Sequence, residues 1–157
     1  MTRTLSTRLI TCFVFGGFAS TLTMACSDDD KTTSETYKEI APLSVGVEVP
    51  PPTGTTTASG IFAFELNEKT GVMTYTLTLT DLTGPASAAH IHKGAPGVAG
   101  PVVLPLVVPA SADPSTGTVT LDPAALADLK AGSLYVNAHT AANPMGEVRG
   151  QLKAHND

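Results

Sequence analysis

Apolar and polar side chains alternate with a period of two over most of the chain beyond its first third. Phe62, Phe64 and Leu66 alternate with Ile61, Ala63 and Glu65, and four threonines alternate with apolar residues over 73–80. Because successive side chains of a strand point to opposite faces, this pattern predicts strands with one face in a core. Turn residues at 67–71 indicate a hairpin with one wet, threonine-rich face.

Similar segments, separated by glycine and proline, predict further strands. The expected strands are 45–49, 61–66, 73–80, 88–93, 102–108, 117–121, 133–139 and 147–152. Pro105 marks an edge strand or an interruption, because proline cannot donate a ladder hydrogen bond. About eight short strands with turns between them predict an all-β fold, namely an antiparallel Greek-key-like β-sandwich.

One segment departs from this period and predicts a single short helix. Asp122 can cap the helix, and Pro123 suits its first position. The Ala- and Leu-rich residues up to Lys130 favour helix, and Gly132 can end it. We therefore expect a two-turn helix between the late strands.

The first 25 residues have the character of an export signal. Arg3 and Arg8 precede an apolar run over 9–19, which is too short to span a bilayer as a helix. Ala25 before Cys26 resembles the lipobox of bacterial lipoproteins, in which the cysteine is lipidated. We predict a lipoprotein signal peptide over 1–25 with Cys26 acylated, for example by palmitate; a non-lipidated signal peptide is the alternative.

Residues 26–43 are polar and acidic and lack alternation, so we expect a flexible acidic tether there. Without residues 1–25 the nine basic residues fall to seven against 14 acidic ones, a net charge of −7. No cluster of Lys and Arg is present to neutralise phosphates, which argues against a nucleic-acid partner. We expect a lipid-anchored protein of the bacterial cell envelope, at the outer membrane or cell surface, with the membrane as one partner.

Three histidines are the candidate metal ligands. His90 and His92 stand two apart on one expected strand, so their side chains share a face with Cα atoms about 6.6 Å apart. His139 shares a face with Asn137 on a later strand. Imidazoles at this spacing can chelate one ion, and an imidazole-only site suits copper or zinc.

A structural alternative explains the same residues without a metal. In it Glu147 and Arg149 pair at the surface, while His90 and His92 anchor the loop over 94–100. The sequence leaves both interpretations open.

Two blocks of sequence resemble the CHRD (chordin) domain. They are Ala89-His90-Ile91-His92-Lys93-Gly94 with Gly100-Pro101-Val102-Val103, and Leu134-Tyr135-Val136-Asn137-Ala138-His139-Thr140 with Gly146-Glu147-Val148-Arg149-Gly150-Gln151-Leu152. The resemblance covers residues 44–153 and implies a β-sandwich. Chordin is an extracellular growth-factor antagonist, but its Cys-rich modules have no counterpart in this sequence, so growth-factor binding is not implied.

The favoured function is an exported, membrane-anchored binding or interaction module with a protein partner or an extracellular ligand. The alternative is a copper- or zinc-binding protein that uses His90, His92 and His139, in which the copper or zinc ion is the cofactor. We expect no enzyme, because no serine lies in a Gly-x-Ser-x-Gly elbow and no paired catalytic carboxylates stand out.

Overall fold

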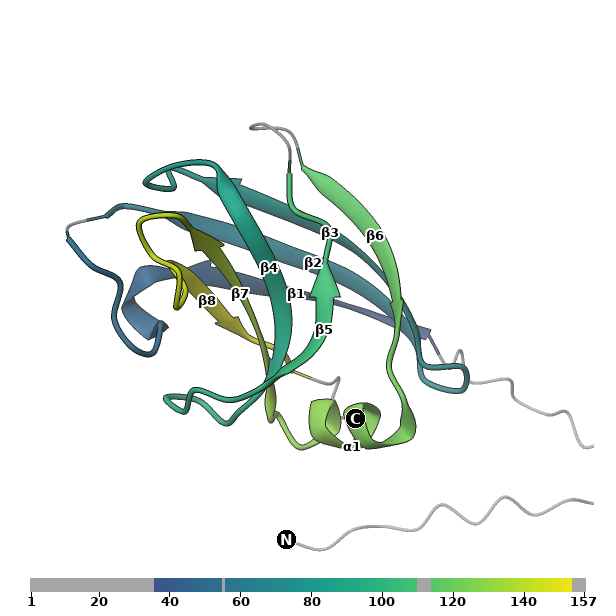
Figure 1. Cartoon of the computed structure of the whole chain (residues 1–157). Helices are drawn as coiled ribbons and strands as arrows, with labels where there is room; N and C mark the ends of the chain where they lie inside the picture. The colour runs from purple at the N-terminus through teal and green to yellow at the C-terminus, as the bar shows by residue number, and fades with distance from the viewer. Residues whose placement is uncertain (1–35, 55, 110–113, 154–157) are drawn as a thin grey trace, which may run out of the picture. The chain divides into compact units, whose positions relative to one another are not determined.

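Eight antiparallel strands form one sheet in the computed structural model, which describes residues 36–54, 56–109 and 114–153 (Figure 1). Within these residues the strands are β1 (Thr36–Ser44), β2 (Ser59–Asn67), β3 (Val72–Thr80), β4 (Ala86–Lys93), β5 (Val102–Leu106), β6 (Ser115–Thr120), β7 (Leu134–Thr140) and β8 (Val148–Gln151).

The strand order is β5-β4-β7-β8-β1-β2-β3-β6, and the sheet curls into a nearly closed barrel. Its two edges approach where Ser115 Oγ donates to the Val107 carbonyl (2.8 Å) and the Val107 amide donates to Tyr75 Oη (2.8 Å). Neighbours that are not consecutive in sequence, such as β3 with β6, require the crossovers of a Greek-key-like chain. The predicted all-β antiparallel fold of about eight strands is confirmed, and Pro105 lies in the edge strand β5.

The core lies inside the curled sheet and is lined by the inward positions of nearly every strand. The rings of Phe62 and Tyr75 stack with centroids 5.2 Å apart. Fully buried apolar side chains come from both sides of the barrel: Phe62, Leu66, Met73, Leu77, Ile91, Leu134, Val136 and Val148. Burying a side chain of this size contributes about 1.5–3 kcal/mol, so these positions fix the register of the strands that carry the polar residues outside.

The predicted short helix is confirmed as α1 (Pro123–Lys130). The Asp122 carboxylate accepts from the Ala125 amide (2.7 Å), and Pro123 occupies the first turn. Gly132 has a φ of 65°, and the Gly132 and Ser133 amides donate to the carbonyls of Leu129 and Asp128, which is a Schellman ending.

Two expectations about the start of the domain are wrong. Residues 36–43, assigned to the tether, lie in β1, whose nine residues are in register with β2 from Thr36 opposite Asn67 to Ser44 opposite Ser59. The strand is hard to recognise because only Ala41 and Leu43 of its residues are buried. The domain therefore begins before residue 44.

The segment 45–49 is not a strand. It contains a turn of 3-10 helix, η1 (Val45–Val47), and Val47 is 53% exposed. Because β1 already fills the place between β8 and β2, the valines that follow it have no free sheet edge to join.

The predicted signal peptide (1–25), Cys26 and residues 26–35 of the tether lie outside the described residues. Among the described residues, no helix has the length and apolar character needed to cross a membrane.

Candidate metal site

Strand β7 is buried on both of its faces, and the candidate site lies on the face that points away from the core. All seven residues of β7 are buried, including Tyr135, Asn137 and His139, which point outward. On this outer face β4 supplies His90 and His92 on one side of β7, and β8 supplies Arg149 and Gln151 on the other side. The polar faces predicted for these strands therefore meet on one sheet.

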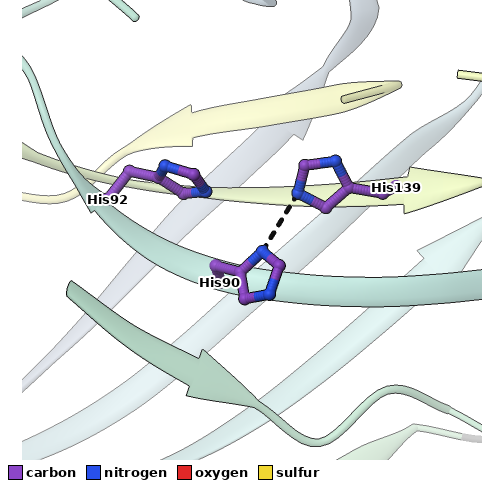
Figure 2. Close-up of side chains that lie close together, drawn as sticks. All are labelled: His90, His92 and His139. Carbon is purple, nitrogen blue, oxygen red and sulfur yellow. Dashed lines mark hydrogen bonds between the residues drawn. The ribbon is translucent and has the colours of Figure 1, made fainter. Parts of the chain in front are cut away.

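His90, His92 and His139 converge, as Figure 2 shows. One ring nitrogen from each histidine lies within 4.8 Å of the other two, and His90 Nδ1 is 3.1 Å from His139 Nε2. Nitrogen ligands at 2.0–2.1 Å from a tetrahedral ion are separated by about 3.3 Å. Small side-chain movements would therefore bring all three nitrogens around one ion.

Backbone carbonyls fix the orientation of two of these rings. His92 Nδ1 is 2.9 Å from the Gly100 carbonyl, and His139 Nδ1 is 3.1 Å from the Pro144 carbonyl. A carbonyl oxygen only accepts, so both Nδ1 atoms carry the proton and both Nε2 atoms present a lone pair. Metal-ligating histidines are commonly held by such a bond from their other ring nitrogen.

The lone pair on His92 Nε2 has no hydrogen-bond partner although the side chain is only 8% exposed. His139 Nε2 has a partner in His90, whose Nδ1–H donates to it. His90 is half-buried, so it is the most accessible of the three. An arriving ion would replace the His90 proton between the two rings, and His90 would then carry its proton on Nε2 or turn its ring.

The surroundings of His90 and His139 favour the neutral form of these two imidazoles. Burial, and then the nearby His92, lower the pKa of His90. Burial and then His90 lower the pKa of His139, although the Pro144 carbonyl opposes the shift. Neutral imidazole is the form in which a histidine can bind a metal ion.

The loop over 94–100 covers His92 and depends on Tyr135 and Arg149. The Tyr135 ring stacks on His92 (centroids 5.0 Å, 13° between planes) and its hydroxyl accepts from the Gly100 amide (3.1 Å). Arg149 lies 3.4 Å from the centre of the Tyr135 ring and donates to the carbonyls of Val98 and Ala95 (both 3.0 Å). A Cβ on Gly100 would collide with the Lys93 carbonyl, so only glycine fits there.

The expected surface pair of Glu147 and Arg149 is wrong. Glu147 is fully buried and accepts from Thr56 Oγ1, the Thr83 amide, Thr83 Oγ1 and Thr140 Oγ1 at 2.7–2.9 Å. Burial alone would raise its pKa, but these hydrogen bonds outweigh burial and lower the pKa to about 2. Glu147 and Arg149 stand two apart in the sequence, which predicts that they share a strand face. In the structure Glu147 bonds to Thr56 and Thr83, whereas Arg149 bonds to the loop over 94–100.

The structure brings together the three histidines predicted from the sequence. His92 anchors the loop over 94–100, as the structural alternative predicted, whereas the predicted anchoring by His90 is wrong because its Nδ1 bonds to His139. The amino-acid sequence does not indicate the role of the carbonyls of Gly100 and Pro144, because a backbone acceptor is present at every residue type. It also gave no sign of Glu48, which follows η1 and is 3% exposed beside this face.

Comparison with protein families matches residues 40–152 to the CHRD domain. The matched range contains all or part of every strand, together with α1 and the three histidines. Neither the curated proteins nor the solved structures give a match to this chain. Because that family match spans most of its length, the chain belongs to the CHRD domain family.

Proposed function

We propose that this CHRD domain is a binding module whose ligand is a transition-metal ion, copper or zinc, held by His90, His92 and His139. The observation that carries the proposal is His92 Nε2, a buried lone pair without a partner that belongs to the cluster of three ring nitrogens. Loop anchoring accounts for His92 Nδ1 but leaves Nε2 unused, and a buried unsatisfied polar atom costs about 1–3 kcal/mol. A metal ion would use it.

The ligand set narrows the choice of ion. Three imidazole nitrogens suit copper and zinc, whereas calcium and magnesium prefer oxygen ligands. The cluster contains three protein ligands, and tetrahedral sites with three protein ligands keep a fourth position for an external group.

A calorimetric titration of the metal-free protein with Zn(II) or Cu(II) tests the proposal. We expect one ion per chain, with the affinity falling at least about 100-fold in His92→Ala and in His139→Ala because each breaks the chelate. His155→Ala, which removes the fourth histidine, is the matched control and should bind as the unchanged protein does. Equal weak heats from the unchanged protein and a His90→Ala/His92→Ala variant would leave the histidines a structural role only.

We also propose that the domain is held at a membrane of the bacterial cell envelope by acyl chains on Cys26. Support comes from the arginines, the short apolar run and the Ala25-Cys26 junction. Cys26→Ser should release an exported soluble form, because the anchoring energy resides in the acyl chains. Cys12→Ser is the control, since Cys12 lies in the predicted signal segment; full retention of Cys26→Ser at membranes contradicts the proposal.

A further inference from the structure

Asn137 lies among the three histidines on the outer face of the sheet. It is directly opposite His90 in the β4–β7 register, two residues from His139, and diagonal to His92. Opposite residues have Cβ atoms about 4.5–5.5 Å apart and diagonal ones about 7–8 Å. The Asn137 side chain is 2% exposed, and its Oδ1 has no hydrogen-bond partner.

Glu48 sets the orientation of the Asn137 amide. Glu48 Oε2 and Asn137 Nδ2 lie 2.5 and 2.8 Å from the point that a Cβ on Gly146 would occupy. A carboxylate only accepts, so the amide NH2 belongs on this side. Glu48 follows η1, which packs against β8, and it lines one surface hollow together with Arg149 of β8, so it lies on the β8 side of Asn137. Oδ1 therefore takes the opposite side, toward β4 and the histidines.

We propose that Asn137 positions a water molecule at the fourth coordination position of the metal ion, with its Oδ1 accepting a hydrogen bond from that water. This step rests on the metal site proposed above. Three histidines leave the fourth position to an external group. Oδ1 is a buried acceptor without a hydrogen-bond partner directly opposite His90, whereas Glu48 Oε2, the other such acceptor near this face, lies on the Nδ2 side of Asn137.

This arrangement makes Asn137 a specificity residue for the external ligand. Water, hydroxide and other small ligands that carry an O–H can donate to Oδ1. Anions without a hydrogen, such as azide, cannot donate, and they also bring negative charge toward an acceptor atom. The site should therefore favour hydrogen-bearing oxygen ligands over simple anions, and Asn137 should account for part of that preference.

Azide binding to the Cu(II)-loaded protein measures this preference directly. Cu(II) loading is measured first for the unchanged protein and for Asn137→Ala and Asn137→Asp, and azide is then titrated while its charge-transfer absorption is followed. In Asn137→Ala the water loses its acceptor, so azide should bind about tenfold tighter. In Asn137→Asp the added charge should weaken azide binding at least about tenfold. Asn67→Ala, an asparagine of the β2–β3 turn, should leave azide affinity unchanged.

The outcomes separate the two proposals. If the unchanged protein fails to bind Cu(II) stoichiometrically, both proposals fall. If it binds Cu(II) but all variants have the same azide affinity, only the role of Asn137 is overturned. A loss of Cu(II) affinity beyond tenfold in Asn137→Ala would make Oδ1 a metal ligand and also overturn that role. If Asn137→Ala does not fold, the near-isosteric Asn137→Asp decides by the direction of its azide shift.

Discussion

Strands β3 and β7 carry similar alternating patterns, yet their outward faces meet different surroundings. On β3 the outward threonines are exposed or half-buried, with Thr74 and Thr80 exposed. On β7 the outward Tyr135, Asn137 and His139 are all buried. The difference lies in the segments that cover β7, such as the loop over 94–100 and the chain around Glu48. Alternation therefore identifies the core side of a strand but does not show whether its other side is wet.

The two outer faces also differ in what their polar groups require. A threonine hydroxyl on β3 can bond to water, whereas a polar group over β7 must find its partners within the protein. Most of them do: Glu147 accepts four hydrogen bonds, and Gln151 Nε2, which has two hydrogens to donate, lies 2.8–2.9 Å from the carbonyls of Gly94, Gly132 and Leu134. Among the buried side-chain atoms near this face, His92 Nε2, Asn137 Oδ1 and Glu48 Oε2 have no hydrogen-bond partner, and the first two belong to the proposed site.

The largest difference between the two faces should appear on neutralising a carboxylate. Glu147→Gln removes the charge and puts an NH2 where Oε2 accepts from the Thr83 and Thr140 hydroxyls, and it should lower the free energy of unfolding by about 2–4 kcal/mol. Glu65→Gln, on the β2 outer face, breaks only an exposed pair with Lys38 and should cost less than about 1 kcal/mol. Urea unfolding followed by circular dichroism measures both; equal losses would mean that the faces are energetically alike.

Acid should act on the same carboxylate. The folded-state pKa of Glu147, about 2, lies below the ordinary value of 4.5. Its contribution is therefore complete above about pH 4.5 and is lost as the pH falls toward 2, a change of about 3 kcal/mol. Unfolding measured across this range should show a steeper decline for the unchanged protein than for Glu147→Gln. Parallel curves would contradict the pKa assigned to Glu147.

A smaller effect is expected from removing one outward side chain on each face. His92→Ala loses the bond to Gly100 and the stacking on Tyr135, and should cost the metal-free protein about 1–2 kcal/mol. Thr74→Ala, on the exposed face of β3, should stay within about 0.5 kcal/mol. Thermal unfolding of both variants without metal measures the two losses of stability. A loss in Thr74→Ala as large as that in His92→Ala would contradict the predicted difference between the two faces.

The smallest effect concerns the histidines near neutral pH. Burial lowers the pKa values of His90 and His139, so folding disfavours their protonation. The metal-free protein should lose stability as the pH falls below about 6.5, and the decline should be shallower in a His90→Gln/His139→Gln variant. An identical pH dependence in the two proteins would show that burial does not perturb these imidazoles.

The sequence predicted the fold and the strand face on which the histidines lie, because both follow from the alternation of apolar and polar residues with a period of two. Phe62 and Ile91 mark the inward side of their strands, and His90 and His92 must then lie outside together. It did not predict the partners of Glu147, since Thr56 and Thr83 reach it from segments 91 and 64 residues away. It also missed β1, where pairing with β2 holds a strand whose own residues show little alternation.

Gly100 places a condition on any attempt to transplant the triad into another protein. Its carbonyl orients His92, yet the chain can pass there only because residue 100 has no side chain to meet the Lys93 carbonyl. Three histidines grafted onto another pair of strands would keep their spacing but lose the carbonyl that selects the Nε2 lone pair. A working graft would have to carry the loop from Lys93 to Pro101 as one unit, closed by the bond from the Lys93 amide to the Pro101 carbonyl.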